Sequence, residues 1–112
     1  MNYRKLNINK LIDYFKKGIK GNVKPTLGVE IEHFIVDEKT GLAAPYEEVA
    51  RIIEKFSPEG EGLIYEEDNL LGYDCEAYSI SLEPASQFEI SISPQKTIME
   101  IHKIYKGFLG RL

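Results

Sequence analysis

Two stretches of this 112-residue chain place pairs of carboxylates on one face of an extended segment. In a β-strand, successive side chains point to opposite faces, so residues two apart share a face. In TLGVEIEHFIVD, Glu30 and Glu32 share one face, and the other face is largely aliphatic. In SISLEPASQFEISISP, the odd positions carry Glu83, Gln87 and Glu89, and the even positions are mostly apolar. Each segment is therefore expected to present two carboxylates opposite an apolar face.

Carboxylates in this arrangement are suited to holding a divalent cation. Residues two apart in a strand are separated by about 6.6 to 6.8 Å, so Glu30 and Glu32 can hold one ion between them or two neighbouring ions. If Glu83 and Glu89 share the same space, a cation must compensate them, because like unit charges roughly 4 Å apart repel by about 4 kcal/mol at an effective dielectric near 20. Hard oxygen ligands favour magnesium, manganese or calcium. Magnesium commonly completes its coordination shell with substrate phosphates, which favours a nucleotide as a second ligand of the site.

The alternative for each strand is an ordinary solvated face, since antiparallel sheets often pack one face on a core and expose the other to water. The repetition of the pattern in two segments favours a shared site. The other reactive side chains do not change this preference. His33 falls on the apolar face of its strand and is expected to be a packed, hydrogen-bonded histidine, His102 a residue at the border of an apolar stripe, and Cys75 a structural thiol.

The elements that must position these residues follow from hydrophobic periodicity and from glycine and proline signals. The final helix is expected to begin at Ser93-Pro94, or slightly later with Thr97 and Glu100 as a capping box. The full order predicted is a helix over 9–17, a strand over 26–36, a turn over 37–41, a helix from Pro45 to about 56, two strands within 63–84 separated by a turn near Gly72, a bend at 84–85, a strand over 86–92 and a helix to the end of the chain.

Charge is distributed unevenly along the chain. Residues 28–89 hold 16 of the 18 acidic side chains and three basic ones, a net charge of −13. The first 27 residues carry seven basic side chains against Asp13 alone, which gives the first helix a basic outer face. An acidic segment of this density repels nucleic acid and attracts cations.

Neither a disulfide nor a membrane span is expected. The single cysteine excludes an internal disulfide and fits a reducing compartment. No apolar run approaches the roughly 20 residues that cross a bilayer, and the amino terminus lacks the apolar core of a signal peptide. We therefore predict a cytoplasmic protein with neither a membrane nor a nucleic acid as partner.

The carboxylate motifs resemble a known pair. LGVEIEHFIVD, followed about fifty residues later by SLEPASQFEISISP, is similar to the paired signature of the glutamate–cysteine ligase family, in particular its plant-type and related bacterial branch. Members carry a G-x-E-x-E strand and a motif close to SLEPGGQFELS before a long helix. Ala85 and Ser86 stand where the family usually has two glycines. The positions of the second motif that agree are Ser81, Leu82, Glu83, Pro84, Gln87, Phe88, Glu89 and Ser91.

The resemblance implies an ATP-dependent enzyme that joins the side-chain carboxylate of glutamate to the amine of cysteine through a γ-glutamyl phosphate, in glutathione biosynthesis. It also implies a catalytic sheet similar to that of glutamine synthetase. Carried over residue by residue, Glu30, Glu32, Glu83 and Glu89 are expected to bind Mg²⁺ or Mn²⁺, and Gln87 to neighbour the site. The alternation of the two strands selects the same four carboxylates.

We therefore predict an α+β fold with a largely antiparallel sheet packed by helices on one face. Residues 1–112 are expected to be the amino-terminal part of a single catalytic domain, because the chain ends at Leu112 inside a helical pattern and family members are several times longer. Without the phosphate-gripping residues expected elsewhere, this portion is predicted to be inactive alone. The alternatives are another carboxylate–amine ligase of the superfamily, with a different amine acceptor, and a non-catalytic cation-binding or interaction module. The oligomeric state stays open.

Overall fold

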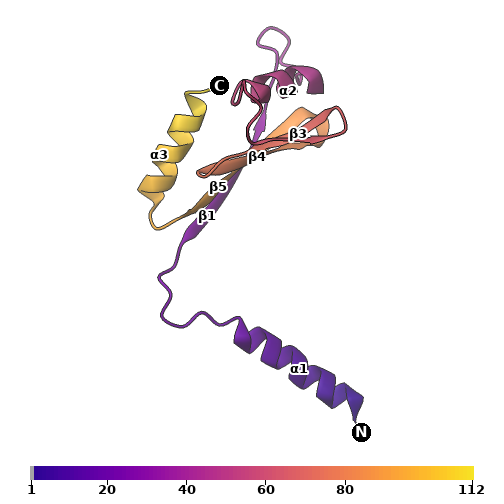
Figure 1. The fold of residues 1–112 in the computed structure, drawn as a ribbon, viewed down its shortest axis with the longest axis vertical. Helices are drawn as coiled ribbons and strands as arrows, with labels where there is room; N and C mark the ends of the chain where they lie inside the picture. The colour runs from indigo at the N-terminus through magenta and orange to yellow at the C-terminus, as the bar shows by residue number, and fades with distance from the viewer. Residues whose placement is uncertain (1) are drawn as a thin grey trace.

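A computed structural model describes residues 2–112 and places five antiparallel strands in one sheet, in the order β1-β5-β4-β3-β2 (Figure 1). Helices α2 and α3 pack on one face of this sheet, so the predicted α+β class is confirmed. The elements in chain order are α1 (Tyr3–Lys17), β1 (Leu27–Phe34), α2 (Tyr46–Glu54), β2 (Leu63–Glu66), β3 (Asn69–Asp74), β4 (Tyr78–Glu83), the 3-10 turn η1 (Pro84–Ser86), β5 (Gln87–Gln95) and α3 (Ile98–Leu109).

The core lies between the sheet and α2 and α3. Strand β5 alternates as the sequence predicts, with buried Phe88, Ile90 and Ile92 on the face that meets the helices. Phe108 of α3 is only 1% exposed. Its ring centroid lies 5.6 to 6.2 Å from those of five other rings, which belong to His33, Phe56, Tyr78, Phe88 and Tyr105. This aromatic cluster holds α3 across the sheet. Within residues 2–112 the opposite face, called here the open face, is covered by no helix.

Arg111 fastens the end of the chain to the same cluster. One guanidinium nitrogen donates to the hydroxyl of Tyr78 at 2.7 Å and the other to the carbonyl oxygen of Phe56 at 2.6 Å. The guanidinium also lies 4.3 Å from the Phe56 ring centroid, a cation–π contact. Burial raises the pKa of the Tyr78 hydroxyl above its usual value, and the contact with Arg111 opposes part of that rise.

The turn predicted near Gly72 is wrong. The chain reverses between Glu66 and Asn69, and Gly72 lies inside β3, opposite Ser81. A Cβ at this glycine would collide with the carbonyl oxygen of Ile80 on β4. The glycine is therefore needed where two strands approach closely, a role that its sequence context does not distinguish from that of a turn residue.

The ends of the helices also differ from the prediction. The last helix begins at Ile98 with the capping box of Thr97 and Glu100, so the later of the two predicted starts is confirmed and Ser93-Pro94 is wrong. Pro94 lies in β5, beside the irregular pairing between β1 and β5, where its missing N–H is tolerated. The first helix is longer than predicted and starts at Tyr3, because the Asn2 side chain caps it by accepting from the Lys5 N–H.

Helix α1 stands apart from the rest of the chain. None of its residues is buried, and it lies beyond the end of the sheet (Figure 1). The Cα radius of gyration is consequently 19.9 Å, whereas about 13 Å is expected for a compact chain of this length. Within residues 2–112, no helix has both the length and the apolar character needed to cross a membrane.

The connection between β4 and β5 adopts a backbone that favours glycine. Ala85 and Ser86 have φ of 60° and 59°, in the left-handed region. These are the two positions at which the resemblance places glycines. A non-glycine residue in this region costs roughly 1 to 2 kcal/mol, so the sheet imposes a strained turn between the strands that carry Glu83 and Glu89.

Replacing Ala85 and Ser86 together by glycine is expected to stabilise the protein by about 1 kcal/mol, because strain relief exceeds the entropy that glycine adds to the unfolded chain. The melting temperature should rise by about 4 to 8 °C, measured by circular dichroism. The matched control is Ala43→Gly at an exposed residue outside the left-handed region, which should be neutral or destabilising. A double variant that melts below the parent would contradict the strain assigned to this turn.

Candidate functional site

The strand register brings the predicted ligands onto the open face. Glu32 of β1 pairs with Glu89 of β5, and Glu89 pairs with Ser81 of β4. Paired residues project to the same side of an antiparallel sheet, so these three side chains form one row. The neighbouring rows on the same face hold Phe34, Gln87 and Glu83 on one side and Glu30, Ser91 and Ser79 on the other.

Glu89 occupies the centre of this arrangement. Directly opposed residues have Cβ atoms about 4.5 to 5.5 Å apart, and diagonal neighbours are about 7 to 8 Å apart. Glu32 is directly opposite Glu89, whereas Glu30 and Glu83 are its diagonal neighbours on β1 and β4. The four carboxylates therefore lie on three adjacent strands of one face, with Glu89 between the other three.

Serine hydroxyls orient two of the carboxylates. Ser81 donates to an Oε1 of Glu83 at 2.8 Å, and Ser91 donates to Oε1 of Glu89 at 3.3 Å. Glu30, Glu32 and Glu83 are exposed, while Glu89 is half-buried. Both serines share the odd parity of the glutamates in the sequence, which is the signal that predicts their place on this face.

The open face lacks its own positive charge on these strands. The sequences of β1, β4 and β5 contain neither lysine nor arginine, and His33 projects to the opposite, packed face. Like charges directly opposite one another destabilise a sheet, so a cation bound between Glu32 and Glu89 would stabilise this pair.

Within the part of the chain from residue 2 to 112, no three His, Cys, Asp or Glu side chains gather closely enough to hold an ion by themselves. Magnesium is usually bound through one or two carboxylates together with water and substrate phosphates. The opposed pair of Glu32 and Glu89 supplies two such carboxylates, and the ligand role of all four glutamates stays a prediction.

His33 is a packed residue, as predicted. Its ring stacks on Phe88 with centroids 4.7 Å apart and planes 3° apart. Nδ1 lies 3.1 Å from the carbonyl oxygen of Ile31, which can only accept, so Nδ1 is the donor there, and Nε2 forms a hydrogen bond with the Tyr105 hydroxyl at 2.9 Å. Both ring nitrogens are thus occupied. Cys75 donates to the Tyr78 carbonyl oxygen at 3.3 Å, as a structural thiol does, and His102 is exposed on α3.

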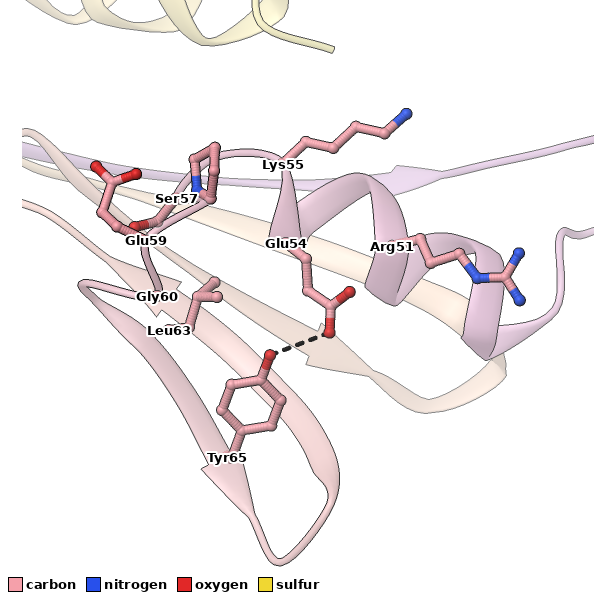
Figure 2. Close-up of a pocket in the computed structure, with 9 residues that line it drawn as sticks. Arg51, Glu54, Lys55, Ser57, Glu59, Gly60, Leu63 and Tyr65 are labelled. Atoms are coloured by element: carbon pink, nitrogen blue, oxygen red, sulfur yellow. Dashed lines mark hydrogen bonds between the residues drawn. The ribbon is translucent and has the colours of Figure 1, made fainter.

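A hollow separate from the open face lies between the end of α2 and strand β2 (Figure 2). It is open to solvent, has a volume of about 590 Å³, and none of the four predicted ligands lines it. Tyr65 donates to Oε1 of Glu54 at 3.0 Å, and this hydrogen bond raises the pKa of the tyrosine hydroxyl. Arg51 and Lys55 both line the hollow, but their charged ends lie apart from each other in Figure 2. Their charges do not converge on a ligand position, so we assign no chemistry to this hollow.

Several known proteins are similar to the chain in sequence. No protein-family model matches the sequence. The chain is 35% identical over 92 residues to glutamate–cysteine ligase, chloroplastic, of Nicotiana tabacum, and 33% identical over 89 residues to the proteins of the same name from Medicago truncatula and Arabidopsis thaliana. Each match covers 79% of this chain. The predicted resemblance to the glutamate–cysteine ligases is confirmed.

The glutamate–cysteine ligases that match are much longer than this chain. The chain spans 17 to 18% of the length of these relatives. The family is a ligase family by the names of its members.

Proposed function

We propose that this chain supplies the metal-binding face of an ATP-dependent glutamate–cysteine ligase that acts in glutathione biosynthesis. The observation that carries the proposal is the directly opposed pair of Glu32 and Glu89, with Glu30 and Glu83 as diagonal neighbours, on a sheet face without a helix. Similarity to plant glutamate–cysteine ligases supports the same reaction.

The proposed reaction has two steps. A side-chain oxygen of glutamate attacks the γ-phosphorus of ATP, which forms γ-glutamyl phosphate and releases ADP. The amine of cysteine then attacks the acyl carbon, and phosphate leaves as the amide bond forms and the amine loses a proton. Mg²⁺ or Mn²⁺, when bound, neutralises charge on the phosphate oxygens during such transfers.

The residues of this chain have distinct parts in that scheme. Glu32 and Glu89 would hold the ion most directly, and Glu30 and Glu83 would hold a neighbouring ion or its water shell. The hydroxyls of Ser81 and Ser91 keep two of these carboxylates oriented by donating to them. Gln87, half-buried in the row beside Glu89, offers an amide N–H to a phosphate or carboxylate oxygen.

The chain alone is expected not to catalyse ligation. Anionic phosphates and the α-carboxylate of glutamate need cationic partners, and β1, β4 and β5 supply none. The amine acceptor is proposed as cysteine by similarity, and another carboxylate–amine ligase activity is the closest alternative. ATP, glutamate and cysteine are thus proposed ligands of a complete enzyme. The cytoplasmic location stays a prediction, and the named relatives are chloroplastic proteins.

A thermal scan with and without Mg²⁺ tests the proposal on this chain itself. Binding to the folded state alone adds about 1.4 kcal/mol when the ion is at ten times its Kd. We expect the melting temperature to rise by about 5 to 10 °C. Addition of ATP together with Mg²⁺ should raise it further, because phosphate oxygens complete the coordination shell.

Two double variants distinguish Mg²⁺ binding at the open face from a general effect of acidic charge. The double variant Glu32→Gln/Glu89→Gln should lose the shift, whereas Glu38→Gln/Glu61→Gln removes two exposed carboxylates elsewhere and should keep it. A shift with Mg²⁺ that ATP does not increase would favour a simple cation-binding module over a ligase. Equal shifts in the two double variants would remove the basis for the metal-binding face.

A further inference from the structure

Strand β1 forms a long free edge of the sheet. It has eight residues and, within residues 2–112, it pairs along one side only, with β5. The other edge of the sheet is β2, which has only four residues. A free edge presents backbone N–H and C=O groups that can pair with another chain, and proteins usually keep such edges short or cover them. The backbone of β1 is therefore able to accept a further strand.

The apolar layer on the packed face of the sheet is incompletely covered at β1. Val29 pairs with Ile92 of β5, and Ile31 pairs with Ile90. The two β5 residues are 4% and 0% exposed. Their β1 partners are only half-buried, although they lie in the same rows. A strand beside β1 that carries apolar side chains on this face would bury Val29 and Ile31 as well.

Helix α3 offers the same strand an apolar wall. The hydroxyl of Tyr105 forms a hydrogen bond with His33 of β1, so this side of α3 faces β1. Ile98 lies seven residues before Tyr105 and Leu109 four residues after it, which places all three on one side of the helix. Ile98 is 71% exposed and Leu109 is 44% exposed. Apolar side chains of an added strand would therefore meet both β1 and α3.

On the open face the same edge is acidic. Glu30 and Glu32 are the charged side chains of β1 on this face, and β1, β4 and β5 contain neither lysine nor arginine. Opposite charges on paired strands stabilise a sheet, whereas like charges destabilise it. A second copy of β1 at this edge would place the glutamates of both copies on one face. The edge therefore disfavours a second copy and favours a strand with basic side chains on the open face.

We propose that β1 is the docking edge for an extended strand in which aliphatic residues alternate with lysine or arginine. The aliphatic side chains lie on the packed face, and the basic ones lie beside Glu30 and Glu32. The chain spans 17 to 18% of the length of the ligases it matches, so the source of this strand is the remainder of a complete ligase. The inference rests on the proposed function, because the basic residues bring to the open face the cations that phosphates and the α-carboxylate of glutamate need.

A synthetic peptide tests this edge on the chain itself, without divalent metal. The probe has about seven residues, a usual strand length, with lysine alternating with valine or isoleucine, and a fluorescent label for anisotropy titration. A peptide of the same composition with its lysines grouped at one end should bind at least about tenfold more weakly, because it cannot present one basic and one apolar face. Equal affinities of the two peptides would overturn the proposal.

Two double variants locate the charge that the peptide recognises. Glu30→Gln/Glu32→Gln should raise the Kd of the alternating peptide about three- to tenfold at low salt, because it removes two cross-strand charge pairs. Glu38→Gln/Glu61→Gln removes two exposed carboxylates outside β1 and should change the Kd by less than about twofold. Equal effects of the two double variants would mean that the peptide responds to net charge, which would also overturn the proposal.

Hydrogen exchange identifies the edge directly. At ten times its Kd, the alternating peptide should slow exchange about tenfold at the β1 amides that do not donate to β5. The amides of β2, the other edge, should be unaffected. Slower exchange at β2 alone would contradict the proposal. Protection of β1 that grows with protein concentration in the absence of peptide would assign the edge to a second copy and would contradict it as well. Because metal is absent throughout, this result and the Mg²⁺-dependent thermal shift can fail independently.

Discussion

Replacing Phe108 by alanine is expected to lower the free energy of unfolding by about 3 to 5 kcal/mol, because truncation leaves a cavity that the surrounding rings cannot fill. Phe108 is 1% exposed and contacts rings from α3, the sheet and the end of α2. Small domains have a total stability of about 5 to 15 kcal/mol. The variant should therefore be largely unfolded at moderate urea concentrations, as followed by circular dichroism.

Leu109→Ala is the matched control for this prediction. Leu109 is the next residue of α3 but is 44% exposed, so its truncation should cost less than about 1 kcal/mol. Similar losses for the two variants would mean that α3 does not pack on the sheet through Phe108. A larger loss of stability in Phe108→Ala than in Leu109→Ala would show that α3 covers the sheet through Phe108. The opposite face would then be the open one.

Replacing Glu89 by glutamine is expected to weaken Mn²⁺ binding in the presence of ATP by about 10- to 100-fold, since it removes the carboxylate closest to the other three. The register predicts a ranking. Glu32→Gln should be nearly as damaging, because Glu32 is directly opposite Glu89, and Glu30→Gln and Glu83→Gln should cost less. Titration calorimetry gives the four affinities.

The control for this ranking is Glu61→Gln, an exposed carboxylate in the loop before β2. It should leave the affinity unchanged within about twofold, which allows only for the loss of one long-range charge. Four equal losses would show that Mn²⁺ responds to net charge rather than to the geometry of the open face.

The residues of the open face could be predicted from the sequence, but the pairing of residues between its strands could not. Alternation alone places Glu30 with Glu32, and Glu83 with Gln87 and Glu89, on faces opposite the core. Which residues stand opposite each other depends on the length of the β4–β5 turn and on its left-handed residues, Ala85 and Ser86. The irregular pairing near Leu27 adjusts the register again on β1. These are tertiary features, and the sheet selects them at the cost of local strain.

The two wrong predictions at Gly72 and Pro94 share one cause. Gly72 and Pro94 have the properties of turn and helix-start residues, yet both lie inside strands because neighbouring strands determine their places. The aromatic cluster around Phe108 was likewise outside the reach of local patterns, since it joins residues from β1 to α3. The separation of α1 from the sheet could not be predicted either, because its amphipathic spacing indicates contact with an apolar surface but does not specify which one.

The most direct test of the metal-binding face is paramagnetic broadening by Mn²⁺ in an NMR spectrum of the ¹⁵N-labelled protein, recorded with ATP. We expect the first amide signals to broaden to belong to the middle of the open face, around Glu32, Ser81, Glu89 and Ser91. The acidic turn of Glu66, Glu67 and Asp68 provides an internal control of high charge density. Broadening that begins at this turn and spares the open face would contradict the metal-binding role of the four glutamates.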